Sequence, residues 1–295
     1  MSNKAIFLIG LVAVTLWGCA KDNLDTTFQQ REKISFRVSV EDFSLQPTKA
    51  TAVTAAPSSI KVSAVNGTAG ADAEVWSNTV FTKASGSNYW QSSMLWPESD
   101  QHYRFYAVYP TTYAMTFASG GPTIAASNAD DVITAYASSP TYNSTTGNAM
   151  VFNHIFSRLT ALTVVSEYDL SEVSIKLTPR TGGTYNLYAG NGKTDGTGWS
   201  SVTQGAQMVV ANAAGLNEMD LYLVPGEYEL TATWTATIGN YEQTFTNKTA
   251  VVNLVAGKTN KVTATLSASA VPIQLSVSLT PWSDRSVDVE FPIDD

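Results

Sequence analysis

The chain has 295 residues, and 17 Lys and Arg against 25 Asp and Glu give it a formal net charge of −8. Since 44% of the residues are hydrophobic and 11% aromatic, it can form substantial cores and does not have the composition of a disordered chain. The acidic balance argues against a nucleic-acid partner. With two histidines and one cysteine, a His/Cys zinc site is not expected, and we predict no metal and no cofactor.

The N-terminus has the pattern of an export signal. Lys4 precedes an apolar run, Ala5–Leu16, that is too short to span a bilayer. The sequence Leu-Trp-Gly-Cys ending at Cys19 resembles the lipobox of bacterial lipoproteins, in which the cysteine thiol carries the lipid. We therefore predict a signal peptide over residues 1–18 and a palmitate-bearing lipid anchor on Cys19 in the outer membrane. An ordinary signal peptide with an incidental cysteine is the alternative.

Most of the chain after a polar tether at residues 19–30 has the pattern of β-strands. Ile34–Glu41 alternates apolar and polar residues with a period of two, as a half-buried strand does. Asn-Gly, Gly-Gly and Pro-Gly turns separate the strands, and the best helix candidate, Ala125–Tyr136, is short. Further strands are expected at Ser59–Val65, Tyr103–Tyr109, Ala161–Val165, Val173–Leu177, Leu221–Val224, Tyr228–Thr235, Lys261–Leu266, Ile273–Leu279 and Val287–Phe291.

Many short strands without intervening helices favour an all-β fold of sandwich type. The strands are too many for one ordinary sandwich, and residues 138–148 have no apolar period. We therefore predict two β-sandwich domains in tandem, an N-terminal domain over residues 31–147 and a C-terminal domain over residues 148–295.

A search for catalytic patterns indicates no enzyme. Neither His102 nor His154 lies near a nucleophile motif of the G-x-S-x-G type. Gly190–Thr194 lacks the first glycine of a phosphate-binding loop and is interpreted as a hairpin loop. The carboxylate pairs Asp130–Asp131 and Asp294–Asp295 are interpreted as solvated charge. The scattered tryptophans suit packing, although sugar stacking is the other use of such residues.

Four segments together resemble the fimbrillin family of Bacteroidota lipoproteins, the Mfa-like type V pilins. They are the lipobox with its tether, the strand at Lys33–Val40 followed by Pro47–Thr51, the Trp96-Pro97 pair followed by Tyr103–Pro110, and Phe152–Leu159. The closing Thr280-Pro281-Trp282 also recurs in the Mfa-like branch. The resemblance implies that both sandwich domains are transthyretin-like and that subunits polymerise by strand exchange.

In this family a protease cuts after the first strand, which then leaves the sheet. Here that strand would carry Ile34, Phe36, Val38 and Val40 on its buried face, which represents roughly 6–12 kcal/mol of burial. A donor strand from another subunit must replace this burial, and Val287, Val289 and Phe291 have the required alternation. The alternative is that this C-terminal segment is the last strand of its own domain.

The expected processing site departs from the family pattern. The family's best-known protease is Arg-specific, whereas this chain has Lys49 before Ala50. A Lys-specific or trypsin-like protease would cut here. Alternatively, the protein is never cut and serves as an anchor or capping subunit.

These expectations define a non-catalytic fimbrial subunit or adhesion lipoprotein at the outer membrane and cell surface. Its expected partners are other fimbrial subunits, the lipid anchor, a maturation protease and a surface receptor. Two other classes stay open. One is a carbohydrate-binding surface lipoprotein, which exposed coplanar aromatics would favour; the other is a glycan-active enzyme, which would need a cleft with paired carboxylates.

Overall fold

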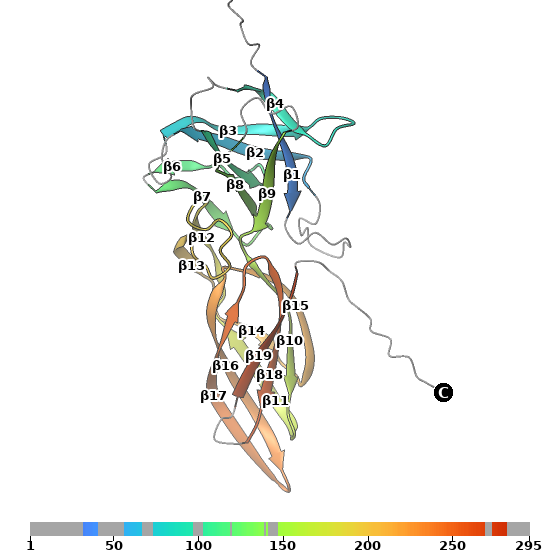
Figure 1. The fold of residues 1–295 in the computed structure, drawn as a ribbon. Helices are drawn as coiled ribbons and strands as arrows, with labels where there is room; N and C mark the ends of the chain where they lie inside the picture. Colours follow the sequence, from blue (N-terminus) through green and yellow to red (C-terminus); the bar gives the residue numbers. More distant parts are fainter. Residues whose placement is uncertain are drawn as a thin grey trace, which may run out of the picture. The chain divides into compact units, whose positions relative to one another are not determined.

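The computed structural model describes residues 32–40, 56–66, 73–96, 103–118, 120–138, 140, 147–268 and 273–281, all in one compact unit that begins at Glu32. Every regular element in these residues is a β-strand (Figure 1), which confirms the all-β class. None of them forms a helix long and apolar enough to cross a membrane. The strands are β1 (Lys33–Val40), β2 (Ser59–Asn66), β3 (Ala73–Lys83), β4 (Trp90–Leu95), β5 (Tyr103–Tyr109), β6 (Thr116–Ala118), β7 (Gly121–Ser127), β8 (Ile133–Ala137), β9 (Asn148–His154), β10 (Ser157–Val165), β11 (Asp169–Leu177), β12 (Arg180–Asn186), β13 (Trp199–Gln204), β14 (Met208–Ala211), β15 (Gly215–Leu223), β16 (Gly226–Ile238), β17 (Tyr241–Leu254), β18 (Lys258–Leu266) and β19 (Ile273–Pro281).

The N-terminal strands form a closed ring in the order β1-β4-β3-β2-β5-β8-β9, which we call the N-terminal ring. Two of its ladders are very short. Strands β3 and β4 pair only at Thr82–Gln91 and Lys83–Trp90, and β8 and β9 pair only at Ile133–His154 and Thr134–Asn153. The ring is therefore two sheets, β4-β1-β9 and β3-β2-β5-β8, whose facing edges meet at two corners.

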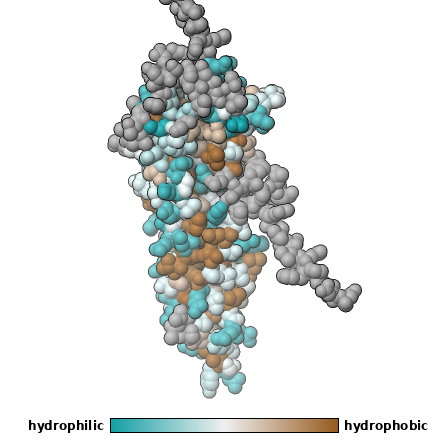
Figure 2. Space-filling view, viewed as in Figure 1, coloured by the Kyte–Doolittle hydropathy of each residue, from teal (hydrophilic) through white to brown (hydrophobic). Residues whose placement is uncertain are grey.

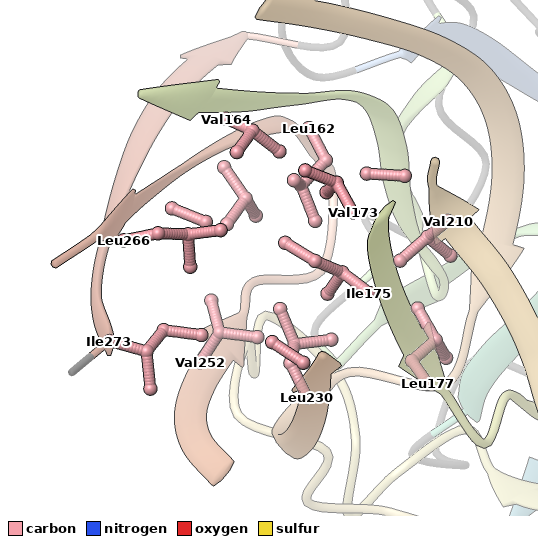
Figure 3. Close-up of a cluster of buried hydrophobic side chains, with 14 of the residues drawn as sticks. Leu162, Val164, Val173, Ile175, Leu177, Val210, Leu230, Val252, Leu266 and Ile273 are labelled. Atoms are coloured by element: carbon pink, nitrogen blue, oxygen red, sulfur yellow. The ribbon is translucent and has the colours of Figure 1, made fainter. Parts of the chain in front are cut away.

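The C-terminal strands form two separate four-stranded sheets, β15-β10-β18-β19 and β14-β11-β16-β17. Figure 3 shows the apolar side chains that fill the space between them, contributed by strands of both sheets. Alternation supplies this core, since along β11 Val173, Ile175 and Leu177 are buried while Ser174 and Lys176 are not. Figure 2 shows apolar surface over these sheets as well, and the exposed apolar residues of β15 and β19 include Leu216 and Leu279.

The N-terminal ring and the C-terminal sheets share one strand order. In the ring, β1 pairs antiparallel with β4 and parallel with β9; in the C-terminal sheets, β10 pairs antiparallel with β15 and parallel with β18. The series β3-β2-β5-β8 likewise corresponds to β14-β11-β16-β17. Strand β19 is the addition, pairing with β18 along its whole length.

A fourth sheet, β13-β12-β7-β6, joins the two halves of the chain. Its central ladder pairs β7 with β12 over five residues, from Gly182–Ser127 to Asn186–Thr123. The approach is close, because a Cβ atom on Gly182 would lie 2.3 Å from the carbonyl oxygen of Ala126. Beside this sheet lies an apolar cluster that includes Tyr106 and Val132 of the N-terminal half and Phe156 and Tyr185 of the C-terminal half.

The best helix candidate of the sequence, Ala125–Tyr136, is not a helix. That segment is the end of β7, a turn, and most of β8. Pairing with β12 satisfies the backbone of β7 in the sheet, and this tertiary contact overrides local helix propensity. Strand β9 begins at Asn148, just after the expected boundary at residue 147, and pairs within the ring. The division into two tandem domains stays a prediction.

Candidate functional site

The first strand lies between two neighbours rather than at an edge of its sheet. Strand β1 pairs with β4 at Lys33–Leu95, Ser35–Gln91 and Phe36–Trp90, with an irregularity between the first two pairs. On its other side it pairs with β9 at five successive positions, from Phe36–Asn148 to Val40–Phe152. Within the described residues, both backbone edges of β1 are thus used in ladders.

The side chains of β1 that point inward belong to the core of the ring. Ile34 and Phe36 have no exposed surface, Val40 is 7% exposed, and Val38 is partly buried against the same cluster. The Phe36 ring meets Phe81 edge-on with centroids 5.2 Å apart and Phe105 with centroids 5.0 Å apart. Edge-to-face contacts of this kind stabilise aromatic pairs beyond area burial, so Phe36 is the central anchor of the strand.

Without β1, its place would be a groove lined by apolar side chains and by unpaired backbone groups of β4 and β9. Such a site binds an extended peptide, because main-chain hydrogen bonds give affinity while alternate side chains fill pockets. Unpaired N–H and C=O groups along a strand edge also promote unwanted pairing with other chains. The sheet geometry therefore supports exchange of one strand for another; whether Ile34, Phe36, Val38 and Val40 are displaced stays a prediction.

A small polar pocket lies where β9 ends. It has a volume of about 140 Å³, and its described lining is Asn153 and His154, Gly192–Thr194 from the β12–β13 loop, Ala256 and Gly257 from the turn before β18, and Lys258 at the start of β18. Backbone hydrogen bonds fix these loops, with Ala256 N donating to Thr194 O at 3.0 Å and Gly257 N to Phe156 O at 2.9 Å. The segment Gly190–Thr194 is part of a hairpin connection between β12 and β13, as predicted.

Behind this pocket, the Nδ1 atom of His154 lies 2.8 Å from Oδ1 of Asp131. Both side chains are almost fully buried, with 3% and 0% of their surface exposed. The carboxylate fixes the orientation of the imidazole ring. No nucleophile pattern accompanies the pair, and no described residues form a cluster of three His, Cys, Asp or Glu suited to a metal ion.

The described tryptophans mostly serve packing. Trp90, Trp96 and Trp234 are at most 2% exposed, and Trp90 donates its indole N–H to the carbonyl oxygen of Pro57 at 2.7 Å. Trp76 and Trp199 are partly buried and pack against apolar clusters. These side chains do not form the exposed coplanar platform that sugar stacking requires.

Burial raises the pKa values of two tyrosines, Tyr106 and Tyr185, where the N-terminal and C-terminal halves of the chain meet. Tyr106 stacks on Tyr136 with centroids 4.8 Å apart. Desolvation raises the pKa of Tyr106 well above its ordinary value of 10.0, and the neighbouring Tyr136 raises it further. Burial likewise raises the pKa of Tyr185, whose hydroxyl donates to the Gly190 carbonyl oxygen at 2.7 Å.

Several predicted site residues lie outside the described residues: Cys19, Lys49, Ala50, His102, Val287, Val289, Phe291 and the pair Asp294–Asp295. Their roles stay predictions. Of the other carboxylate pair, Asp130 is exposed and accepts a hydrogen bond from the Tyr113 hydroxyl at 3.0 Å, whereas Asp131 is buried against His154. The interpretation of Asp131 as solvated charge is therefore wrong.

Sequence reasoning also missed the two lysines of the pocket. Lys193 and Lys258 lie 65 positions apart in the chain and reach one pocket only because the β12–β13 loop meets the β17–β18 turn. Lys258 belongs to no sequence motif, and Lys193 lies in the Gly190–Thr194 segment, whose sequence indicates only a hairpin loop.

Fold and site define a class: all-β proteins of sandwich type whose first strand fills the centre of a sheet. A family model described as fimbrillin-like matches residues 48–282. Because that match covers most of the sequence, the chain belongs to the fimbrillin-like family.

Solved structures show the same fold at low sequence identity. A fimbrial protein from Bacteroides vulgatus has a TM-score of 0.50 and 14% identity, with 84% of this chain and 99% of that chain covered. A candidate cell adhesion protein from Parabacteroides distasonis has a TM-score of 0.53 and 7% identity, with 85% of this chain and 97% of that chain covered. No curated protein matches the chain.

Proposed function

We propose that this chain is a non-catalytic fimbrial subunit that is exported as a lipoprotein and assembles by donor-strand exchange at the cell surface. Lipidation at Cys19 would hold the newly exported subunit in the outer membrane. Cleavage between Lys49 and Ala50 would then separate β1 from the rest of the chain. The segment carrying Val287, Val289 and Phe291 of another subunit would fill the vacated groove.

The observation that carries this proposal is the position of β1. It lies in the middle of a sheet, supplies three fully or almost fully buried side chains to the core, and is the first strand in the described part of the chain. A single cut after it would therefore remove one strand while leaving the remaining strand order continuous. Membership of the fimbrillin-like family supports the same function.

Two experiments test the anchor and the exchange separately. Cys19→Ala should abolish palmitate labelling and membrane retention, and unchanged retention would exclude the lipid anchor. For the exchange, limited digestion of the full chain with a Lys-specific protease should cut first near Lys49 and produce polymers visible by gel filtration and electron microscopy.

A variant lacking residues 287–295 is the matched control for the second experiment. It should be cut at the same rate and remain monomeric, because it keeps the groove but lacks the donor. Cut protein that stays monomeric, or equal polymerisation with and without this segment, would exclude strand exchange through these segments. Purified carbohydrates that bind the uncut chain would instead support the carbohydrate-binding alternative, although the buried tryptophans favour the fimbrial function.

A further inference from the structure

The loop between β12 and β13 contains one of the two Asn-Gly bonds of the sequence, Asn191-Gly192; the other is Asn66-Gly67. At such a bond the backbone nitrogen of the glycine can attack the side-chain carbonyl carbon of the asparagine, because glycine has no side chain to obstruct the approach. The attack is intramolecular, so its rate depends on whether the folded chain lets the two atoms meet. The surroundings of the two bonds therefore decide how fast each one reacts.

Asn191 and Gly192 are both exposed, in the turn that follows β12. In the described part of the chain, the Asn191 side-chain amide forms no hydrogen bond and the Gly192 N–H donates to no backbone carbonyl. The next N–H group is engaged, since Lys193 N donates to Gly190 O at 3.0 Å. A Cβ atom built on Gly192 would meet nothing within 4 Å. Both reacting groups are thus unengaged, and the space around them is open.

Asn186, at the end of β12, is held much more firmly. Its side-chain amide donates to the Gly120 carbonyl oxygen at 2.9 Å. Its Oδ1 atom accepts from the backbone N–H groups of Tyr188 and Ala189 at 2.9 and 2.8 Å. The residue that follows it is Leu187, whose N–H donates to a backbone carbonyl. Neither the side chain of Asn186 nor the nitrogen after it is available for attack.

Asn66 is restrained by its sheet. It is the last residue of β2, and its backbone lies between two antiparallel ladders, opposite Ala73 of β3 on one side and Tyr103 of β5 on the other. Ring closure needs rotation about the asparagine backbone, and pairing on both sides opposes that rotation. The folded structure should therefore slow the reaction at Asn66 but leave Asn191 reactive.

We propose that Asn191 is a site of spontaneous deamidation in the folded protein. The Gly192 nitrogen loses its proton and forms a bond to the side-chain carbonyl carbon of Asn191, and the side-chain nitrogen leaves as ammonia. Water then opens the resulting succinimide at one of its two carbonyl carbons, which gives aspartate or isoaspartate. The reaction consumes one water, releases one ammonia, and requires no oxidant, reductant or enzyme.

The modification alters a loop on which another element depends. The Thr194 carbonyl oxygen accepts a hydrogen bond from Ala256 N at 3.0 Å and so ties the β12–β13 loop to the turn before β18. Both products add a negative charge to the loop, and isoaspartate also adds one atom to its main chain. Amide hydrogen exchange at Ala256 should accelerate as the conversion proceeds, because this hydrogen bond loses its fixed acceptor.

The test incubates the full chain in mildly alkaline buffer and follows the replacement of amide NH2 by OH with peptide mass spectrometry. Trypsin releases Thr181–Lys193, which contains both Asn186 and Asn191, and Val62–Lys83, which contains Asn66. In the folded protein, Asn191 should convert about tenfold faster than Asn66, and Asn186 should stay unchanged. In urea, where the sheet no longer restrains Asn66, the two Asn-Gly bonds should convert at similar rates.

Two variants complete the test. Gly192→Ala should slow the conversion of Asn191 about tenfold, because a side chain then obstructs the attack. Asn191→Gln should prevent the mass gain in Thr181–Lys193 and keep amide exchange at Ala256 at its starting rate throughout the incubation. An Asn191 that stays intact in the folded protein while converting in urea, equal rates at Asn191 and Asn66 in the folded protein, or unchanged conversion in Gly192→Ala would each overturn the proposal.

Discussion

The two halves of the chain hold the strand at the same topological position in different ways. In the N-terminal ring, β1 forms three ladder pairs with β4 and five with β9 among the described residues. Its counterpart β10 forms seven with β15 and seven with β18. Strand β10 is thus paired over most of its length on both sides, while β1 pairs with β9 only from Phe36 to Val40 and with β4 only at Lys33, Ser35 and Phe36.

Side-chain hydrogen bonds and an ion pair also hold β10 more firmly to its neighbours than β1 is held to its own. Arg158 of β10 forms a two-bond ion pair with Asp220 of β15, at 2.8 and 3.0 Å. The Ser157 hydroxyl donates to the Leu223 carbonyl oxygen at 2.9 Å, and the Asn260 amide donates to the Arg158 carbonyl oxygen at 3.3 Å. Strand β1 instead relies on apolar contacts, which a replacement strand of similar pattern can reproduce. The same topological position is therefore held by fewer ladder pairs and mainly apolar contacts in the ring, and by more ladder pairs and polar contacts in the C-terminal sheets.

The largest expected effect comes from removing the anchor of β1. Phe36→Ala should lower the free energy of unfolding by about 3–5 kcal/mol, because it leaves a cavity between Phe81 and Phe105. Urea denaturation measures this change. Val38→Ala, at a partly buried position of the same strand, is the matched control and should cost clearly less. Equal costs would mean that Phe36 is not the residue that anchors β1.

A change at the sheet that joins the halves should be the next largest. Gly182→Ala would place a Cβ atom 2.3 Å from a backbone oxygen of β7 and should cost about 2–3 kcal/mol through forced separation of β7 from β12. Amide hydrogen exchange should then accelerate in both strands. Thr184→Ala on the same strand is the control. Exchange that accelerates only in β12 would show that the two strands open independently.

Breaking the ion pair on β10 should have a smaller effect. Asp220→Asn should cost about 1–2 kcal/mol, since it removes the charge partner of the buried Arg158, but Asp220 is partly open to solvent. Glu218→Gln on the same strand changes an exposed carboxylate and should be nearly neutral in urea denaturation. Identical stability of both variants would remove the ion pair from the explanation of why β10 is held more firmly.

The smallest expected effect is on stability at alkaline pH. Because the pKa of Tyr106 is raised in the folded state, the unfolded chain loses its proton first as the pH rises. The stabilisation is complete below pH 10 and decreases as the pH rises through the folded-state pKa. Thermal melting between pH 8 and 11 should show a smaller decline for Tyr106→Phe than for wild type. Tyr241→Phe, at an 80% exposed position, should decline as wild type does.

Sequence periodicity predicted where the strands lie better than it predicted which strands pair with each other. The alternation of Ile34, Phe36 and Val40 revealed a strand and its buried face, since one face of such a strand packs on a core. The alternation does not show that β1 pairs with β4 on one side and with β9 on the other. The shared strand order of the two halves was invisible, because the β1 sequence KISFRVSV and the β10 sequence SRLTALTVV satisfy the same topology with different residues.

The missed features all depend on tertiary contacts. The segment from Ala125 to Tyr136 is rich in alanine, yet its first part is a strand because β12 lies beside it. Asp131 sits next to Asp130 in sequence, but the chain turns between a solvated position and a buried one. The lysine pocket requires two connections from different sheets to converge. None of these contacts leaves a periodic trace in the sequence.

The sheet formed by β6, β7, β12 and β13 has a mechanical consequence. A fibre subunit under tension would have to transmit load between its two halves, and the covalent link between β9 and β10 is only two residues long. The β7–β12 ladder provides a second path, in which five residue pairs share the load. Forced unfolding of such a subunit would be governed by the rate at which the β7–β12 ladder separates, rather than by equilibrium stability. The two halves would therefore move apart only after this ladder had separated.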